Sequence, residues 1–468
     1  MSGCSRRQFL TGSALAALGG TLALAGCAPM SHEEAAAKKR EAAAGNDKNA
    51  DGEVTAIGTG MGKHGEFTVE VSAKDGAIDR ITVLDSRETP GMGDVAMEKM
   101  TQAIIDNQTL AVDTISGATL TSMAFLTAVG SALDAMGESA DDWKNREPAA
   151  WVSDVELPEE ADVVVIGAGG AGFAAAITAA NEGKSVVLMD KMGVFGGDTA
   201  LSGGEMAVPG NWIQVTQGIE DSPENLVSDM LVGGDNKGDP ELVAIIANGA
   251  LDSANWLTYE GGVSWKHDLM QFGGHNIKRS IIPITHSGSE MTTKLTNRVN
   301  GMDDIVLIDN TKAVELVTDD AGAVTGVKVE NPVTGDTSEV KCKAVVLATG
   351  GFGSNVDMRV KYNPEMDDKI LSTDSVAAQG DGIVMAEKIG ADTIDMEYIQ
   401  TYPVCDPETG ALLYVGDVRL ENHGILVNRE GDRFVQELDR RDVISNGIKN
   451  QTDGVAFLLF DQAAADET

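Results

Sequence analysis

The chain has 468 residues, 42% of them hydrophobic, and is therefore long enough for two or three domains that each bury a core. Its 73 acidic and 35 basic residues give a formal net charge of −38. This charge disfavours nucleic acid and anionic lipid surfaces as partners, because both would repel it. A small anionic substrate is still compatible with the charge, since its site needs only a local group of arginines.

The first 30 residues indicate export. "SRRQFL" (Ser5–Leu10) places two arginines before a mildly apolar run that ends at Leu24 and is too short and glycine-rich for a stable membrane span. The run closes in "LAGC", which ends at Cys27. Together these elements resemble a twin-arginine lipoprotein signal. The resemblance implies export of the folded protein through the twin-arginine translocon, with its cofactor already acquired. A lipid on Cys27 would then anchor it to the outer face of the cytoplasmic membrane, or to its periplasmic side.

The cysteine pattern gives little further structure. Of the four cysteines, Cys4 and Cys27 belong to the signal. Only Cys342 and Cys405 remain, with neither a CxxC pair nor a metal-binding spacing. This excludes a disulfide framework and leaves a single bond between these two residues open.

A small α+β domain is predicted at 53–137, after an Ala-rich, charged tether at 28–52. Alternating segments from Val54 to about Glu88 include a Lys-Asp-Gly turn signal and predict a β-hairpin. The stretch "VAMEKMTQAIIDNQ" and the segment after Ser122 both predict helices. Polar, proline-containing and aperiodic residues at 138–160 then predict a linker.

At Ala161 the pattern changes to a β-turn-α-β unit, "ADVVVIGAGGAGFAAAITAANEGKSVVLMD". Gly167, Gly169 and Gly172 form G-x-G-x-x-G between the first strand and the helix, and Asp190 ends the second strand. This context makes the motif a strong indication of a dinucleotide site, because the glycines let the backbone approach a pyrophosphate at a helix N-terminus. The Asp190 carboxylate is expected to bind ribose hydroxyls and to disfavour the 2′-phosphate of NADP.

Three later motifs identify the dinucleotide. They are "GGDTALSGGEMAVPGN" (Gly196–Asn211), "KCKAVVLATGGF" (Lys341–Phe352) and "QGDG" (Gln379–Gly382). In this order they resemble the FAD domain of the fumarate reductase and succinate dehydrogenase flavoprotein superfamily, from about Ala161 to the chain end. The resemblance implies an α/β Rossmann-like FAD-binding domain with an inserted α+β cap domain, preceded by the small α+β domain.

The resemblance also implies boundaries and FAD-binding residues. The FAD-binding domain covers 161–270 and continues, with the start of the cap, through 271–400, and the rest of the cap occupies 401–468. Members that bind FAD covalently have a histidine before the threonine of the first motif. Here Asp198 precedes Thr199, so FAD is expected to be non-covalent. The implied FAD-binding residues are Gly167, Gly169, Gly170, Ala171, Gly172, Asp190, Lys191, Gly196, Gly197, Asp198, Thr199, Ser202, Gly203, Gly204, Val314, Ala348, Thr349, Gly350, Gly351, Gly380, Asp381 and Gly382.

The segment "DTISGATLTS" has two interpretations. Its Ser and Thr residues precede a helical face and are typical of an N-cap. It also matches D-x-x-[S/T]-G-A-T, the signature of the FMN-binding domain of exported redox proteins. The match implies an FMN joined to Thr119 through a phosphoester bond made by a flavin transferase, whose metal and phosphate Asp113 helps to position. Ser116 and Gly117 complete the motif. With an export signal and a second flavin domain on the same chain, covalent FMN is favoured over the cap.

The segment "NREGDRFVQELDRRD" resembles the part of the superfamily in which an arginine directly before an aspartate donates the proton. That arginine is Arg441, although Arg440 lies beside it. Arginine is too basic to act as an acid unless it is buried against the substrate and reprotonated by a relay. The relay glutamate corresponds to Asp417. Arg419 lies near the position of the relay arginine, which strict counting gives to Leu420.

Two departures from the fumarate reductases bear on the substrate. Tyr402 stands where those enzymes have a histidine before proline, and Asp417 replaces their glutamate. A tyrosine and an aspartate at these two positions resemble the urocanate reductases. The chemistry fits, since a tyrosine can stack on the imidazole of urocanate and an aspartate can accept a hydrogen bond from it. The resemblance implies reduction of urocanate to imidazolepropionate, with electrons passing from a membrane or soluble donor to FMN, then FAD, then the substrate.

Two other functions remain open. One is a fumarate reductase or another 2-enoate reductase, such as one acting on a cinnamate-like acid. The other is an electron-transfer flavoprotein with a vestigial FAD domain. The superfamily continues beyond "LLFDQ" with more cap and substrate-binding residues, so the cap is expected to be truncated and the chain to be a fragment. The electron donor and the oligomeric state are not determined by the sequence.

Overall fold

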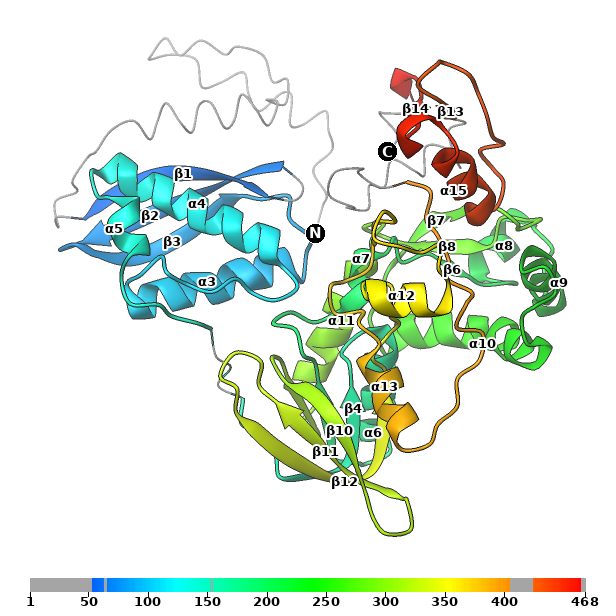
Figure 1. Ribbon diagram of the computed structural model, residues 1–468, viewed down its shortest axis with the longest axis horizontal. Coiled ribbons are helices and arrows are strands. Elements are labelled where there is room, and N and C mark those ends of the chain that lie inside the picture. Colours follow the sequence, from blue (N-terminus) through cyan, green and yellow to red (C-terminus); the bar gives the residue numbers. More distant parts are fainter. Residues whose placement is uncertain (1–52, 63–64, 152, 154, 405–423, 464–468) are drawn as a thin grey trace, which may run out of the picture. The chain divides into compact units, whose positions relative to one another are not determined.

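The structure is a computed structural model that describes residues 53–62, 65–151, 153, 155–404 and 424–463 (Figure 1). The described residues belong to one compact unit. Cys342 is half-buried and has a free thiol. The predicted export signal lies outside the described residues, and so do Cys4, Cys27, Cys405, Asp417, Arg419 and Leu420.

The N-terminal domain is a three-stranded antiparallel sheet with the order β1-β2-β3 and three helices (Figure 1). The predicted Lys-Asp-Gly turn joins β2 to β3, with φ of 54° at Asp75 and 79° at Gly76, the left-handed values that a tight hairpin turn favours. The hairpin prediction is confirmed, and β1 adds a third strand. The elements are β1 (Val54–Gly62), β2 (Gly65–Lys74), β3 (Ala77–Asp85), α3 (Gly93–Asn107), α4 (Thr119–Met136) and α5 (Ala140–Lys144).

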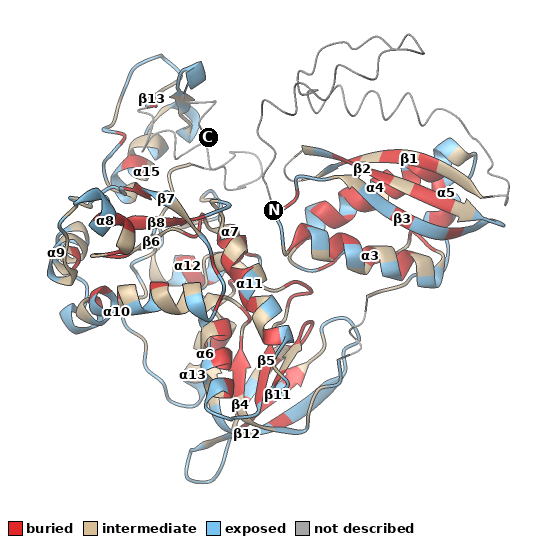
Figure 2. Ribbon diagram, turned by 180° about the vertical axis from the view of Figure 1, so that it is seen from behind, coloured by how far each residue is buried: buried red, intermediate tan, exposed pale blue. Residues whose placement is uncertain are grey.

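Helix α4 packs directly on strand β1. A Cβ atom on Gly58 would lie 1.9 Å from the backbone oxygen of Ala128, and one on Gly60 would lie 2.0 Å from that of Ala124. The two glycines therefore let helix and strand meet backbone to backbone. By length and hydropathy α4 could cross a membrane, but 50% of it is buried, and Figure 2 shows buried residues along the helix and the strands beneath it. We interpret α4 as the core helix of this domain.

The domain continues beyond Gly137 into the segment predicted as a linker. Trp143, in α5, is only 1% exposed and belongs to the core of the domain. Ala149 pairs with Val112 as an isolated β-bridge. A single buried aromatic residue in a polar segment produces no periodicity, which is why the pattern over 138–160 indicated a linker throughout.

The second domain is built on a six-stranded sheet with the order β10-β11-β12-β4-β5-β9. Strands β12, β4, β5 and β9 are parallel, whereas β10, β11 and β12 pair antiparallel. Phe173 and Ile177 of α6 pack with Leu295 of α11 on this sheet, and each is at most 1% exposed. The predicted β-turn-α-β unit is β4-α6-β5. The bounds are β4 (Glu160–Ile166), α6 (Gly170–Asn181), β5 (Val186–Met189), α11 (Gly288–Asn300), β9 (Ile305–Ile308), β10 (Lys312–Thr318), β11 (Val324–Glu330) and β12 (Thr337–Leu347).

A smaller antiparallel sheet, with the order β6-β8-β7, packs with helices inserted between β5 and α11. Further along the chain, β13 and β14 form a two-stranded antiparallel pair within the predicted cap. The remaining bounds are α7 (Gly197–Leu201), β6 (Met206–Ala207), α8 (Trp212–Gln217), α9 (Pro223–Gly233), α10 (Pro240–Tyr259), β7 (Trp265–Met270), β8 (Ser280–Pro283), α12 (Val356–Tyr362), α13 (Asp381–Lys388), β13 (Ile425–Val427), α15 (Arg441–Lys449), η2 (Thr452–Gly454) and β14 (Phe457–Leu459).

Candidate active site

The turn between β4 and α6 is shaped for close approach by a ligand. Gly167 has a φ of 103°, and a Cβ atom there would lie 2.4 Å from the backbone oxygen of Ala348. A Cβ atom on Gly172 would lie 1.8 Å from the backbone oxygen of Gly167, so only glycine fits both positions. Helix α6 begins at Gly170 without a side-chain cap, so its first turn and its dipole favour an anion there.

Asp190 follows β5 and braces this turn. Its Oδ2 accepts a hydrogen bond of 2.9 Å from Ala168 N, and its Oδ1 accepts one of 2.9 Å from Met192 N. Burial raises the pKa of Asp190, and these two hydrogen bonds oppose the rise. Asp190 also lines the cavity beside the turn, where its predicted contact with ribose hydroxyls stays a prediction.

A cavity of about 560 Å³ opens beside the turn, a size typical of small-molecule and cofactor sites. It lies at the carboxyl ends of the parallel strands β4, β5 and β12, the edge at which open α/β sheets bind their ligands. Segments that are distant in the sequence meet there. The predicted FAD-binding residues that line it are Gly167, Gly169, Gly170, Ala171, Asp190, Lys191, Gly197, Asp198, Thr199, Ala348, Thr349, Gly350, Asp381 and Gly382.

The other predicted FAD-binding residues do not line this cavity. In β10, Ala313 lines the cavity in place of Val314. Thr311 and Ser375 also line it and were missed by the sequence analysis. Thr311 follows the parallel strand β9, and that position is the signal that could have identified it. Ser202, Gly203 and Gly204 line a second cavity, and Gly172, Gly196, Gly351 and Gly380 line neither.

The second cavity has a volume of about 1490 Å³ and brings two predicted catalytic side chains together. Arg441 and Tyr402 both line it, and the guanidinium carbon of Arg441 lies 5.1 Å from the centroid of the Tyr402 ring. This distance is within cation–π range. Within the part of the chain that the structure describes, the Arg441 side chain makes no hydrogen bond or ion pair.

Arg440, by contrast, is held by other parts of the protein. Its Nη1 lies 2.6 Å from Asp235 Oδ1 and donates to Gly233 O at 3.2 Å, while its Nη2 lies 2.9 Å from Asp442 Oδ2. The two carboxylates raise the pKa of Arg440. Of the two neighbouring arginines, Arg441 is therefore the one whose charge is available to a ligand in the cavity.

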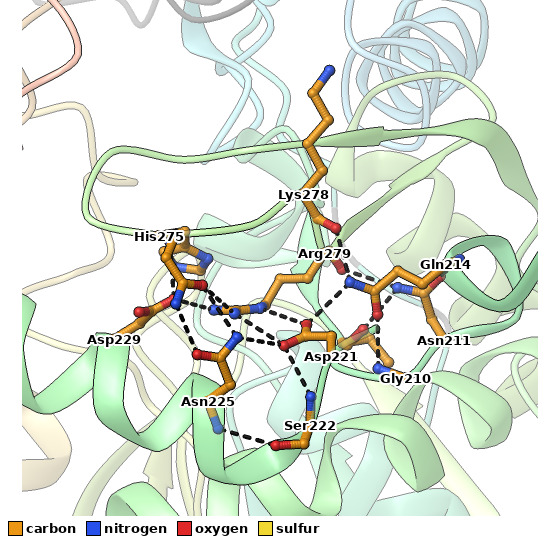
Figure 3. A network of polar contacts seen from close by, with 12 residues as sticks. Gly210, Asn211, Gln214, Asp221, Ser222, Asn225, Asp229, His275, Lys278 and Arg279 are labelled. Carbon is orange, nitrogen blue, oxygen red and sulfur yellow. Dashed lines mark hydrogen bonds and ion pairs between the residues drawn. The ribbon is translucent and has the colours of Figure 1, made fainter. Parts of the chain in front are cut away.

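A buried arginine, Arg279, lies within a network of polar contacts (Figure 3). The Arg279 side chain has 0% exposure, and its Nε and Nη2 donate to the Asp221 carboxylate at 2.8 and 3.1 Å. Its Nη1 donates to Asp229 Oδ2 at 2.6 Å, and Nη2 also donates to Asn276 Oδ1 at 3.0 Å. Asp229 and His275 line the cavity, so the network supports its wall from behind. Burial acts to raise the pKa of Asp221, but hydrogen bonds, above all that from Arg279, bring it below its usual value.

Thr119 is exposed and is the first residue of α4. The residue before it, Ala118, makes no side-chain cap, so the N-cap interpretation of this segment is wrong. Thr121 instead donates to the buried carboxylate of Glu88, and Ser122 Oγ accepts a hydrogen bond of 3.1 Å from Ile115 N. The two contacts fix the backbone on either side of an accessible Thr119 hydroxyl. Of the other motif residues, Asp113 and Ser116 are exposed, and Gly117 has a φ of 92°.

Comparison with protein families supports two flavin domains. A family model of an FAD-binding domain matches residues 162–459, which is more than half of the chain. A family model of an FMN-binding domain matches residues 62–134. The predicted cofactors, FAD and FMN, thus agree with the domains that bind them, and the glycine-lined cavity fits a dinucleotide.

Comparison with characterised proteins decides the family. The chain is 55% identical to the urocanate reductase of Eggerthella lenta over 468 residues, which is 100% of this chain and 76% of that protein. The chain belongs to the fumarate reductase and succinate dehydrogenase flavoprotein superfamily. The predicted family and the predicted class, an FAD-dependent oxidoreductase that acts on CH–CH bonds, are confirmed.

Other members of the superfamily are more distant. The chain is 37% identical over 305 residues to a cytochrome-type fumarate reductase of Shewanella frigidimarina, covering 64% of this chain and 52% of that protein. It is 32% identical over 476 residues to an NADH:acrylate oxidoreductase of Vibrio harveyi, covering 88% of this chain and 46% of that protein. The chain therefore spans about half the length of these two relatives.

The solved structures agree on the fold of this superfamily member. The open conformation of a flavocytochrome c3 fumarate reductase superposes with a TM-score of 0.58 at 34% identity, covering 66% of this chain and 54% of that one. This match confirms the predicted α/β FAD-binding fold, and the preceding FMN-binding domain completes the predicted architecture. The individual site residues stay predictions.

Proposed function

We propose that this flavoprotein reduces the C=C bond of urocanate to give imidazolepropionate. The observation that carries the proposal is the Arg441 guanidinium 5.1 Å from the Tyr402 ring centroid, in the wall of a cavity that flavin-loop residues such as Ser202 also line. The 55% identity to a urocanate reductase supports the choice of substrate. Arg441 is available there because its own side chain makes no hydrogen bond or ion pair among the described residues. Arg440, by contrast, is engaged by two carboxylates.

The chain's own residues bind the substrate and supply the proton. Tyr402 offers a ring face on which an imidazole can stack. Bound FAD supplies the hydride for one carbon of the alkene. Arg441 donates a proton to the other carbon, so the alkene gains one hydride and one proton in total. Because a guanidinium holds its proton strongly, Arg441 must be reprotonated at once, which is the role we propose for Asp417 and Arg419.

The N-terminal domain carries a covalent FMN on Thr119 and passes electrons to the FAD, which is bound non-covalently. The exposure of Thr119 at the start of α4 supports the attachment. Contacts between the two domains support a short path for the electrons, since Gly193 N donates to Ser116 O at 3.1 Å and Gly117 lines the FAD cavity. The electrons come from a membrane-bound or soluble donor.

Replacing Thr119 by alanine should abolish the flavin that stays attached to the denatured protein. The alanine lacks the hydroxyl that forms the phosphoester, whereas Thr119→Ser keeps a hydroxyl and should retain some flavin. The measurement is flavin fluorescence of the denatured protein band after production with a flavin transferase. Ser116→Ala is the matched control and should keep the flavin. Thr121→Ala should keep it as well, although it loses a buried hydrogen bond to a carboxylate, worth about 1.5–3 kcal/mol. Flavin that remains on the Thr119→Ala protein would place the link elsewhere.

We also propose that the protein is exported by the twin-arginine translocon and anchored through a lipid on Cys27, with a flavin transferase acting during maturation. The support is the order of the twin arginines, the apolar run and "LAGC" in the sequence. Cys27→Ala should move the protein from the membrane fraction to the soluble fraction. Unchanged membrane association in that variant would contradict the anchor.

The substrate is tested by comparing turnover of urocanate, fumarate and a series of cinnamates with a reduced viologen as electron donor. Urocanate is expected to give the highest kcat/KM, and imidazolepropionate should be the product. Turnover of fumarate without turnover of urocanate would overturn the choice of substrate. Reducible flavins without turnover of any enoate would instead favour the electron-transfer flavoprotein.

A further inference from the structure

Asp198 occupies the junction of the two cavities. Among the described residues that line them, it is the single residue that lines both the FAD cavity and the large cavity with Arg441. A flavin and its substrate must meet for a hydride to pass between them, and the junction is the place where the two cavities allow this. A charge on Asp198 would therefore act on the reacting part of a flavin bound in the first cavity.

A second carboxyl group lies beside Asp198. Ser375 N donates to Asp198 Oδ1 at 2.5 Å, and Asp374 directly precedes Ser375. Asp374 lines the large cavity and packs against Gly353, where a Cβ atom would lie 1.7 Å from Asp374 Oδ2. The hydrogen bond from Ser375 to Asp198 thus joins the loop after α12 to α7, across 177 residues of sequence.

The surroundings of this pair favour the protonated form. Burial raises the pKa of Asp198, and burial together with the charge of Asp198 raises the pKa of Asp374. Arg359, which is 4% exposed, opposes the rise at Asp374. The Nη2 of Arg359 donates hydrogen bonds to the backbone oxygens of Asp367 and Ile370, at 3.1 and 3.0 Å. Because the charge of Asp198 raises the pKa of Asp374, ionisation of one carboxyl group disfavours ionisation of the other.

Other charges nearby do not neutralise the pair. Lys191, in the FAD cavity, already pairs with Asp381 at 2.6 Å. On the loop that carries Asp374, the other charged residues lining the large cavity are Asp367 and Lys369. The charge of Arg359 lowers the pKa of Asp374, against the effect of burial and of Asp198.

We propose that Asp198 and Asp374 form a carboxyl pair that shares one proton while the FAD is oxidised and takes up a second proton when the FAD is reduced. Reduction by the donor adds two electrons and one proton to the flavin ring and leaves one negative charge on it. The proton that the pair takes from water balances this charge. When the hydride leaves for the substrate, the charge is gone and the pair returns its second proton to water. The proposal rests on FAD binding and not on the identity of the substrate.

The proton should appear in the pH dependence of the FAD midpoint potential. Each proton bound per two electrons changes the reduction equilibrium tenfold per pH unit, which is about 30 mV. The negative charge on the reduced flavin raises the pKa of the pair, so protons are taken up on reduction and the potential falls more steeply as pH rises. Within this pH window we expect a slope of about 60 mV per pH unit in the parent and about 30 mV in Asp198→Asn.

The experiment is a potentiometric titration of the full chain with bound FAD, without substrate, in a Thr119→Ala background that removes the proposed second flavin. Asp374→Asn should lose the extra slope as well, and it keeps the contact of Asp198 with Ser375. Asp453→Asn is the matched control, because Asp453 lines the same large cavity but pairs with Arg429 at 3.1 Å, and its slope should equal that of the parent.

Equal slopes in the parent and in Asp198→Asn would overturn the proposal, as would a uniform offset of the potential with no change of slope. If Asp198→Asn fails to hold FAD, then Asp374→Asn decides, and a parental slope in that variant, or loss of FAD from both, would assign the pair a structural role only. A failure of the proposed substrate leaves these slopes unchanged, since no substrate is present.

Discussion

Replacing Arg441 by lysine is expected to leave FAD bound and to slow alkene reduction by about 10²–10⁴-fold or more, the usual contribution of a general acid. Lysine lacks the planar guanidinium and presents its proton from a different point, so the geometry of proton transfer is lost. The side chain makes no ion pair among the described residues, so its replacement breaks no salt bridge there. The measurement is the steady-state rate with a reduced viologen and urocanate, together with the visible absorbance of the bound flavin.

Arg440→Lys is the matched control, because it changes the neighbouring arginine in the same way. Arg440 directly precedes α15 and pairs with Asp235 and with Asp442, which lies in the first turn of the same helix. Such pairs near the protein surface are worth at most about 1 kcal/mol. Its lysine variant should therefore keep most of the activity. A severe loss in Arg440→Lys with a mild loss in Arg441→Lys would show that the proton donor was assigned one residue too late.

Replacing Arg279 by methionine is expected to lower the free energy of unfolding by about 3–5 kcal/mol, the cost of leaving buried charges without their partner. The Asp221 side chain is 0% exposed and that of Asp229 is 10% exposed, so water cannot replace the guanidinium. The measurement is urea unfolding of the FAD-loaded protein. Arg298→Met is the control, since Arg298 pairs at 3.6 Å with Glu260 on the surface and should contribute at most about 1 kcal/mol.

The pH dependence gives this prediction a second test. The pKa of Asp221 is lower in the folded protein than in the unfolded chain, so its contribution to stability is present above the unfolded pKa and is lost as pH falls through the folded pKa. The difference in stability between the parent and Arg279→Met should therefore shrink in acid. A loss below about 1 kcal/mol at neutral pH, or a difference that grows in acid, would contradict the role given to the network.

Much of the fold follows from local sequence patterns. The β-turn-α-β unit was predictable because the glycines, the apolar strand and the terminal Asp190 all lie within 30 residues or so and obey one geometry. Many of the cavity residues followed from motifs at the ends of the parallel strands β4, β5 and β12, and these strand ends share one edge of the sheet. Asp381 and Gly382, at the start of α13, followed from the family resemblance alone. The prediction of Thr119 as the attachment site rests on a short sequence motif, and recognising such a motif requires no information about distant contacts.

The rest of the site depends on contacts between distant residues. Arg279 meets Asp221 across 58 residues, and Asp198 meets the Asp374 loop across 177, so no spacing in the sequence marks either. The N-cap interpretation of this segment, which the FMN-binding motif outweighed, fails because the residue before α4 is Ala118, whose side chain cannot accept a hydrogen bond. Thr121, inside the helix, donates instead to Glu88, a partner 33 residues away. Local propensity described that segment correctly as a helix start, but tertiary contacts decided which hydroxyls stay accessible.

The backbone contact of Gly58 and Gly60 with α4 bears on the order in which the protein matures. Because the helix rests on the strand without intervening side chains, the position of Thr119 is set by the finished sheet and not by the seven-residue motif alone. The proposed flavin transferase would therefore meet, at "DTISGAT", a surface that exists only after folding. Under this proposal flavin attachment would report on the quality of the fold, and Gly58→Ala should yield protein without attached flavin although the motif itself is intact.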